Sequence, residues 1–300
     1  MHIYYNNLIC TICNNSKSFT LIYKNINDGR GSELINIYKC SNCKQVFLGN
    51  YDLFYNEELY NYYDDYISYN MVDIFNPLTQ LSYSKVIKLL KSKSEKLDSI
   101  LDVGCGMGEF VYSALKSGIN ATGIEFSESA VKIAKKYNLP VSKVDFNSAS
   151  LSNMRFDAIT FFEVFEHLNK PYDFLTRASS LLNPNGLIYL TTPNFNSLDR
   201  YIYKDKWTAI HREHINYFTT KSIKKLLKMD KRLNIVYFET RNASLKIFFK
   251  NNIKSLDVDL NSREIINNSV ILKIIKFILN KILNVLGIGS TMIIILKKIE

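Results

Sequence analysis

A glycine-rich stretch is the first candidate for chemistry in this sequence. It runs from Leu101 to Gly108 and reads Leu-Asp-Val-Gly-Cys-Gly-Met-Gly, directly after an apolar run that begins at Ile100. Gly104, Gly106 and Gly108 lack the Cβ atoms that would keep a ligand away from the backbone, and glycine tolerates a positive φ. The pattern predicts a strand, a turn and a helix with a small molecule against the turn. An ordinary tight turn is the alternative.

A carboxylate follows the next expected strand, which covers residues 119–124. This residue is Glu125, seventeen positions after Gly108. In doubly wound folds, a carboxylate at this place accepts hydrogen bonds from ribose hydroxyls. A dinucleotide site would have its third glycine at the position of Glu109, whose charge near the helix start would repel a pyrophosphate. The loop is therefore expected to bind a cationic nucleoside.

Four cysteines form a second chemical pattern. Cys10 and Cys13 make one C-x-x-C pair, and Cys40 and Cys43 make another after 26 intervening residues. Two such pairs can supply four thiolates to one tetrahedral Zn²⁺ and leave no open position for catalysis, so the spacing predicts a structural zinc ribbon. Disulfides are the first alternative and are disfavoured in a reducing compartment. A redox C-x-x-C is the second, and it needs no second copy.

The third pattern is an aromatic and histidine-rich segment at residues 207–219. It holds the single tryptophan, Trp207, and two of the four histidines, His211 and His214. We expect this segment to form the substrate side of the site. A metal shared by the two histidines would need further ligands that the neighbouring sequence does not supply. Histidines buried in an ordinary loop are another alternative.

Together these stretches resemble the class I S-adenosylmethionine-dependent methyltransferases. The glycine stretch resembles their first motif, Gly123–Glu125 their second, residues 156–168 the fourth-strand motif, and residues 181–192 the turn and fifth strand. The resemblance covers residues 96–240. It implies an α/β fold with a doubly wound, Rossmann-like sheet of seven strands, and S-adenosylmethionine as cofactor. The cofactor-binding residues that it implies are Asp102, Gly104, Gly106, Gly108, Glu125, Phe126, Asp145 and Phe162.

The resemblance also implies roles for individual side chains. Asp145 would accept a hydrogen bond from the adenine amino group, and Phe126 would lie on the adenine ring, although both could equally be ordinary residues at strand ends. Glu163, Glu166 and His167 follow the fourth strand. In the family such residues mostly shape the floor of the pocket, and no catalytic role is assigned to His167.

A finer resemblance concerns the catalytic residues. Glu213-His214, followed by Tyr217 and Phe218, resembles a motif of sugar methyltransferases, including zinc-ribbon enzymes that C-methylate nucleotide-linked deoxysugars. The matching histidine there is the proposed base, so His214 is expected to be the general base, oriented by Glu213. Those enzymes have a long C-terminal nucleotide-binding domain, whereas only some sixty residues follow Thr240 here. This difference disfavours a nucleotide-linked substrate.

Hydrophobic periodicity and capping residues predict the elements that position these residues. We divide the chain into a zinc ribbon at residues 1–50, a tyrosine-rich helical connector at 51–95, and a methyltransferase domain at 96–300 with a helical insertion near 243–288. The expected helices are Pro77–Leu90, Gly108–Ser117, a helix capped by Ser127 that ends at Tyr137, and Pro171–Leu182; the expected strands are Val141–Val144, Phe156–Phe162, Leu187–Thr192 and Met292–Leu296, with a turn at Asn183–Gly186.

The remaining features concern location and partners. The net charge of +10 is spread along the chain and reflects composition rather than a basic patch. The first ten residues lack the features of a secretory signal, so we expect a cytoplasmic protein. Residues 265–286 form an amphipathic helical pattern interrupted by lysine and asparagine. It is too polar to span a membrane, and peripheral contact with a membrane or partner stays open.

These observations favour methyl transfer to a hydroxyl of a sugar that belongs to a surface glycan or its precursor. The sulfonium methyl is already electrophilic, so the protein would align the acceptor for in-line displacement and take up its proton. The substrate is expected to be a small molecule or a glycan. Nucleic acid is disfavoured because Phe-Phe-Glu-Val-Phe at 161–165 does not match the motif of base methyltransferases. C-methylation of a nucleotide-linked ketosugar, RNA methylation and a non-catalytic binding module are the alternatives.

Overall fold

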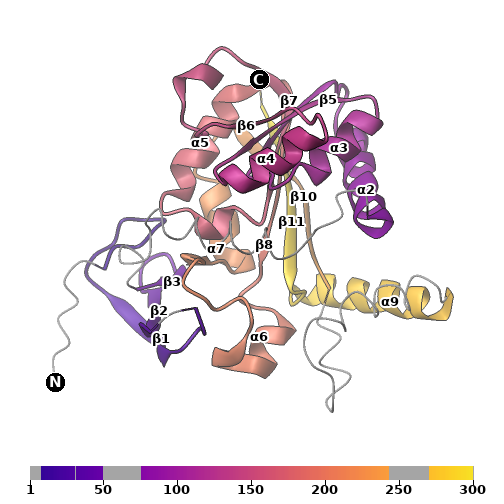
Figure 1. Ribbon diagram of the computed structural model, residues 1–300. Coiled ribbons are helices and arrows are strands. Elements are labelled where there is room, and N and C mark those ends of the chain that lie inside the picture. The colour runs from indigo at the N-terminus through magenta and orange to yellow at the C-terminus, as the bar shows by residue number, and fades with distance from the viewer. Residues whose placement is uncertain (1–7, 31, 50–75, 243–269, 300) are drawn as a thin grey trace.

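The computed structural model describes residues 8–30, 32–49, 76–242 and 270–299. Within these ranges the strands form two sheets, a large sheet of seven strands and a small sheet of four (Figure 1). Residues 51–75 of the expected connector and residues 243–269 of the expected insertion lie outside the described residues.

The large sheet has the strand order β10-β11-β8-β7-β4-β5-β6. All neighbouring pairs are parallel except those that β11 makes with β8 and with β10. The predicted doubly wound α/β fold is therefore confirmed. Its strands are β4 (Ser99–Val103), β5 (Asn120–Glu125), β6 (Val141–Lys143), β7 (Phe156–Phe162), β8 (Leu182–Pro193), β10 (Leu233–Arg241) and β11 (Thr291–Lys298).

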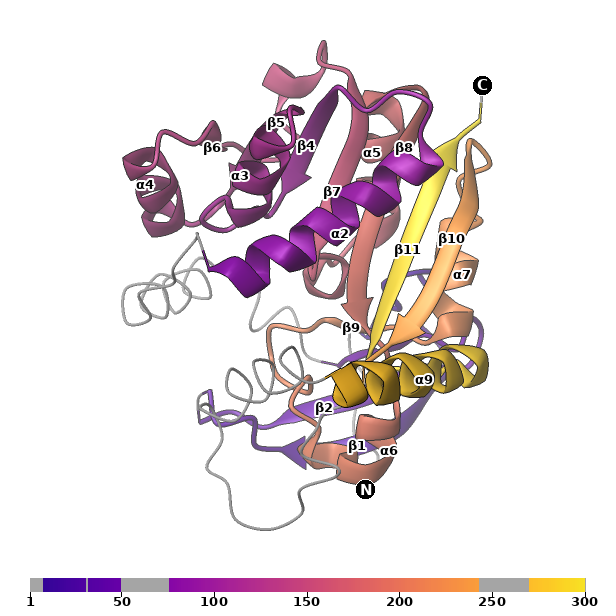
Figure 2. The ribbon, with the colours of Figure 1, turned by 90° about the vertical axis from the view of Figure 1, so that its right-hand side faces the viewer.

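Helices cover both faces of the large sheet (Figure 2). On one face lie α2 (Pro77–Lys93), α3 (Glu109–Lys116) and α4 (Glu128–Lys136), which bury Leu90, Phe110 and Val131 in one apolar core. On the other face lie α5 (Pro171–Leu181) and α7 (Thr220–Leu227), which bury Leu175 and Ile223 in a second core. This burial of apolar side chains on both faces supplies the main driving force for the fold.

Side-chain caps explain where several helices begin. The Asn76 carboxamide oxygen accepts from the amides of Leu78 and Thr79 at the start of α2, where Pro77 has no amide hydrogen to satisfy. The Ser127 hydroxyl accepts from the Ala130 amide at 3.1 Å, which confirms the predicted start of α4. These caps satisfy backbone donors that the helices themselves leave unpaired.

The beginning of β8 differs from the sequence-based prediction. We expected a turn at Asn183–Gly186 before the strand, but β8 already begins at Leu182. Leu182 pairs with Phe156 and Leu187 with Ala158, so four residues of β8 bulge out opposite one residue of β7. Asn185 has a φ of 61° within this bulge. The turn chemistry of the sequence therefore produces an irregularity inside the strand rather than its start.

The small sheet joins distant parts of the chain. Three of its strands are N-terminal: β1 (Phe19–Ile26), β2 (Ile35–Cys40) and β3 (Val46–Leu48). The fourth, β9 (Asn216–Tyr217), pairs with β3 in antiparallel register. The N-terminal region is therefore continuous with the methyltransferase domain through this sheet, which lies beyond the carboxyl ends of the parallel strands (Figure 2).

The helix α9 (Val270–Leu286) extends away from the base of the large sheet (Figure 1). Leu283 is buried against the domain, whereas Ile274, Phe277 and Ile282 are at least half exposed. None of the helices in the described parts of the chain has the length and apolarity needed to cross a bilayer. The peripheral membrane contact expected for this region stays a prediction.

The shorter helical pieces are α6 (Leu198–Tyr203), η2 (Ala149–Leu151), η3 (Phe165–His167) and η4 (Lys204–Lys206).

Ion pairs fasten the small sheet to the segment before β9. The Asp28 carboxylate, whose side chain is fully buried, accepts from Nε and Nη2 of Arg212 at 2.9 and 2.8 Å. Arg30 pairs with the Glu213 carboxylate. Burial alone would raise the pKa of Asp28, but hydrogen bonds from Arg212 outweigh it and lower this pKa to about 2. The hairpin between β1 and β2 therefore holds residues 212–213 in place.

Replacing the buried carboxylate tests this attachment. We expect Asp28→Asn to lower the free energy of unfolding by roughly 1–3 kcal/mol at pH 7, because charged hydrogen bonds to Arg212 are lost. Since the folded-state pKa is depressed, the contribution is present above the ordinary aspartate value of about 4 and is lost as the pH falls towards 2. Urea denaturation of both proteins between pH 7 and pH 2.5 measures it. Equal stability at pH 7 would contradict the assignment.

Candidate active site

The glycine loop connects β4 to α3 at the carboxyl edge of the large sheet. Gly104, Gly106 and Gly108 have φ angles of 68°, 54° and 85°, which residues other than glycine rarely adopt. A Cβ at Gly104 would lie 2.8 Å from Val164 Cγ2, and one at Gly108 would lie 2.9 Å from Leu139 Cδ1. Backbone conformation therefore favours glycine at all three positions, and crowding adds to this requirement at Gly104 and Gly108.

Glu125 fixes the tip of this loop. Its Oε2 accepts from the Gly106 amide at 2.8 Å, and its Oε1 accepts from the amides of Phe126 and Ser127 at 2.6 and 3.0 Å. The carboxylate thus ties the loop to the end of β5, with its remaining lone pair available for a ligand. The structure brings the predicted glycines and the predicted carboxylate together.

Asp102 lies deeper than the other predicted cofactor residues. It is 2% exposed and accepts a hydrogen bond from Thr160 Oγ1 at 2.6 Å. Burial raises the pKa of its carboxyl, and with the charge of Glu125 and the opposing hydrogen bond from Thr160 the value is about 7. Asp102 therefore braces β4 against β7 beneath the loop.

The three remaining predicted residues have different surroundings. Phe126 is 46% exposed beside Glu125, and Asp145 is exposed just after β6, at the same edge of the sheet. Their predicted contacts with adenine stay predictions. Phe162 instead lies in an aromatic cluster with Phe110 and Tyr189, at ring-centre distances of 4.8 and 5.2 Å. Its observed contacts are those of a core residue under α2 and α3.

The four cysteines converge as the sequence pattern predicts. The Sγ atoms of Cys10 and Cys43 are 3.4 Å apart, those of Cys13 and Cys40 are 3.6 Å apart, and all four lie within 4.8 Å of one another as free thiols. Four sulfurs at about 2.3 Å from one zinc ion would be roughly 3.8 Å apart. The donor set fits a structural Zn²⁺.

The backbone of both cysteine turns supports this fit. The Asn14 amide donates to the Cys10 carbonyl and the Lys44 amide donates to the Cys40 carbonyl, each at 3.0 Å. Asn14 and Lys44 also share a positive φ, of 52° and 67°. The two C-x-x-C pairs are therefore equivalent knuckles that present their thiols to a common point.

A cluster of one glutamate and two histidines lies between the glycine loop and the small sheet, and the sequence analysis did not predict that these residues meet. Glu166 and His167 belong to η3, directly after β7, and His214 comes from the segment before β9. One donor atom from each of these three residues lies within 4.8 Å of the other two. The distance between Glu166 Oε1 and His214 Nε2 is 4.0 Å. The structure therefore gives His214 two partners that are almost fifty residues away in sequence.

Backbone carbonyls set the tautomers of both histidines. The Nδ1 atom of His214 lies 2.8 Å from the Ala209 carbonyl oxygen, and that of His167 lies 2.9 Å from the Glu213 carbonyl oxygen. A carbonyl only accepts, so each Nδ1 carries the hydrogen and each Nε2 keeps a lone pair. Burial, followed by the neighbouring His211 and His167, lowers the pKa of His214 well below its usual value. His214 is therefore neutral near pH 7.

The Glu213 carboxylate has a partner other than His214 in the structure. We expected its carboxylate to orient His214, but that carboxylate pairs with Arg30 of the small sheet. The Ala209 carbonyl orients His214 instead, and the backbone carbonyl of Glu213 orients His167. The reason is the hairpin between β1 and β2, which brings a guanidinium to Glu213.

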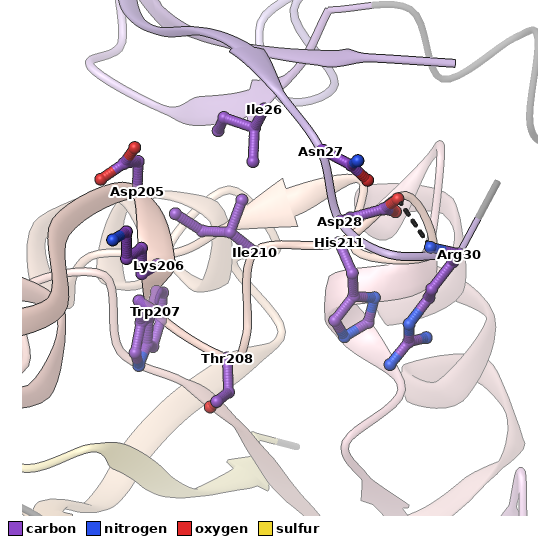
Figure 3. A pocket seen from close by; sticks show the side chains of 10 residues that line it. All are labelled: Ile26, Asn27, Asp28, Arg30, Asp205, Lys206, Trp207, Thr208, Ile210 and His211. Carbon is purple, nitrogen blue, oxygen red and sulfur yellow. Dashed lines mark hydrogen bonds between the residues drawn. The ribbon is translucent and has the colours of Figure 1, made fainter. Parts of the chain in front are cut away.

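A cavity of about 270 Å³ opens between this hairpin and residues 205–211 (Figure 3). Its polar lining includes Asn27 and Thr208, and Trp207 and His211 also face it. The ring centre of His211 is 3.8 Å from that of His214, so the cavity ends one side chain away from the cluster. Trp207, Thr208, Ile210 and His211 of the expected substrate side thus contribute to a pocket.

The sheet order, the reversed strand β11 and a glycine loop tied to a carboxylate define a Rossmann-like methyltransferase fold of class I. A family model described as a methyltransferase domain matches residues 78–229, just over half of the chain, and the chain belongs to this family. The prediction of a class I methyltransferase is thereby confirmed.

Several curated relatives of this chain are O-methyltransferases by name. The ubiquinone biosynthesis O-methyltransferase of Dechloromonas aromatica (strain RCB) is 32% identical over 129 residues, which are 41% of this chain and 56% of the relative. The protein of the same name from Pelagibacter ubique (strain HTCC1062) is 30% identical over 224 residues, which are 69% and 87%. The chain thus spans about half the length of several curated relatives that it matches, and most of the length of another.

Solved structures support the fold. A SAM-dependent methyltransferase from Archaeoglobus fulgidus is 21% identical, with a TM-score of 0.52 over 73% of this chain and 94% of its own. The plantazolicin methyltransferase BpumL in complex with SAH is 19% identical, with a TM-score of 0.53 over 82% of this chain and 92% of its own.

Metal analysis tests the cysteine site. We expect one zinc ion per chain, and we expect Cys40→Ser to release it and to lower the melting temperature, because the binding free energy of such a site is largely folding free energy. Cys105→Ser is the matched control, since Cys105 lies in the glycine loop far from the four converging thiols in sequence. A wild-type protein that is stable without metal would contradict the prediction.

Proposed function

We propose that the chain transfers the methyl group of S-adenosylmethionine to a hydroxyl oxygen of a small molecule. The observation that carries the proposal is the adjacency of two features. Val164, which lies against Gly104 of the loop, directly precedes η3, which holds Glu166 and His167. A cofactor on the loop would therefore bring its methyl group close to His214, the partner of Glu166.

The cofactor contacts follow from the loop. The amides of the loop and the absent side chains of its three glycines allow a ligand to lie against the backbone, and Glu125 has one lone pair left for a ribose hydroxyl. S-adenosylmethionine supplies a sulfonium-bound methyl group. A complex of BpumL with SAH, the product of such a transfer, has the same fold.

The transfer itself is a displacement. The acceptor oxygen forms a bond to the methyl carbon, the carbon–sulfur bond breaks with its electrons passing to sulfur, and the hydroxyl proton leaves. A hydroxyl is a poor nucleophile until it loses this proton, so a positioned base accelerates the step. His214 is suited to this role because it is neutral and its Nε2 lone pair is not used by the Ala209 carbonyl.

A sugar hydroxyl is our first choice of acceptor, as part of a surface glycan or its precursor. The cavity beside His211 is lined mainly by polar and charged side chains together with one aromatic, Trp207. Such a lining suits a polyhydroxylated ring, since each hydroxyl needs a hydrogen-bond partner when it leaves water. The volume of about 270 Å³ is close to the lower end of small-molecule sites, about 300 Å³.

A phenolic hydroxyl is the second candidate, favoured by the relatives named ubiquinone biosynthesis O-methyltransferase. A labelled-methyl assay separates the two. Purified protein with S-adenosylmethionine should label sugars or glycan precursors; label in dihydroxybenzoate-type phenols would favour the second candidate. Label only in RNA, or in none of these, would contradict the proposal.

The cofactor site has its own test. We expect Glu125→Ala to weaken S-adenosylmethionine binding by roughly 1.5–3 kcal/mol, because hydrogen bonds to a charged group are lost and the Gly106 amide loses its acceptor. Calorimetry measures the affinity. Glu128→Ala is the matched control, since Glu128 is exposed and forms ion pairs with the exposed Lys132 and Lys143, which contribute little to stability. Unchanged affinity in Glu125→Ala would rule out the ribose contact.

The proposed base is tested by turnover. We expect His214→Ala to reduce kcat by about 10² to 10⁴, the usual scale for a positioned base, while the affinity for S-adenosylmethionine changes by a few-fold at most. His211→Ala should reduce kcat less, because His211 lines the acceptor cavity and reaches the cluster only through the ring of His214. Full activity of His214→Ala on the true acceptor would show that another residue acts on the hydroxyl.

A further inference from the structure

The cluster of Glu166, His167 and His214 contains three hydrogen-bond acceptors that face one another. Glu166 Oε1 is buried, and within the described residues no hydrogen bond of normal geometry reaches it, although the Glu163 carboxyl lies close enough to interact with the Glu166 carboxyl. The two histidines use Nδ1 for backbone carbonyls, which leaves both Nε2 lone pairs unused by those carbonyls, and His214 Nε2 lies 4.0 Å from Glu166 Oε1. A buried oxygen without a donor is costly, so a proton or a cation placed among these acceptors would stabilise the arrangement.

We propose that Glu166, His167 and His214 form a binding site for a divalent cation, distinct from the cysteine site. Two imidazoles and one carboxylate are a common ligand set for Zn²⁺, Fe²⁺ and related ions when open positions are needed for other ligands. An ion at about 2.0–2.2 Å from each donor needs the donors roughly 3–3.5 Å apart. Glu166 Oε1 and His214 Nε2 are 4.0 Å apart and the three donors lie within 4.8 Å of one another, so binding an ion requires the side chains to move together by roughly 1 Å.

The surroundings of the three residues have the features of an orienting shell. Metal-bound histidines usually donate their other N–H to a carbonyl or carboxylate, and both histidines here do so. Metal-bound carboxylates are usually hydrogen-bonded as well, and Glu166 Oε2 accepts from Thr192 Oγ1 at 3.0 Å. Each ligand is therefore held on the side away from the proposed ion.

The position of the site suggests what the ion would do. The cluster lies between the glycine loop, through Val164 and Gly104, and the cavity, through His211. A divalent cation lowers the pKa of a hydroxyl that coordinates it, and the proton can then pass to water. The role in catalysis rests on the proposed function, whereas the binding site itself does not. With the ion bound, the Nε2 lone pair of His214 is a ligand and His214 acts on the hydroxyl through the ion; without the ion, His214 acts as the direct base proposed above.

Cobalt binding tests the site without an activity assay. Co²⁺ is titrated into protein whose cysteine site already contains zinc, and calorimetry and visible absorption are recorded. We expect one Co²⁺ per chain with the weak bands of nitrogen and oxygen ligands, and without the intense near-ultraviolet band of cysteine thiolates. Glu166→Gln and His214→Gln should each weaken this binding by at least about tenfold.

Controls make the result decisive. Glu166→Gln preserves size and an acceptor for Thr192, so it should stay folded, which thermal melting and S-adenosylmethionine binding verify. His211→Gln is the matched control: it removes a buried histidine three residues from His214 that is outside the ligand set, and it should leave Co²⁺ affinity unchanged.

Two results would overturn the inference. One is wild-type protein that takes up no Co²⁺ beyond the cysteine site; the other is Co²⁺ affinity that is the same in wild type, Glu166→Gln and His214→Gln. A third result concerns the role of the ion in catalysis. If protein that contains zinc only in its cysteine site transfers methyl groups at full rate without added cation, the ion has no catalytic role, while the proposed function stands. Tight, variant-sensitive Co²⁺ binding without any methyl transfer would support the site and count against the proposed function.

Discussion

The pairing of β3 with β9 is the contact on which the functional part of the structure depends. It joins an N-terminal module to residues 216–217, and Asn216 reinforces it by accepting from Thr11 and donating to the Phe165 and Leu168 carbonyls. A single side chain thus connects the cysteine knuckles, the small sheet and η3. Because Asn216 is 1% exposed, its hydrogen bonds are protected from competition by water.

This arrangement gives the N-terminal module a positioning role in the active site. The buried Asp28–Arg212 pair and the Arg30–Glu213 pair hold the two residues directly before His214. The backbone carbonyl of Glu213 in turn orients His167. A metal in the cysteine site would therefore affect the histidine cluster only indirectly, by stabilising the sheet that carries these contacts.

Several parts of the fold and site follow from sequence alone because their determinants are local. The glycine spacing, the apolar run before it and the carboxylate after the next strand specify a loop at one edge of a doubly wound sheet. The limits of β7 at Phe156–Phe162 and the cap at Ser127 agree with the structure for the same reason. The beginning of β8 does not, because pairing with β7 extends the strand across a turn-forming sequence.

The sequence by itself determined the class of fold, the loop with Glu125 and the two cysteine knuckles, since each depends on the spacing of residues within one element or between neighbouring elements of the chain. Only the tertiary structure decided which side chains surround His214. Glu166 and His167 reach it across almost fifty residues, and Arg30 reaches Glu213 across more than 180. Such contacts have no sequence period, because they arise from the order of strands in the large sheet and from β9 joining the small one.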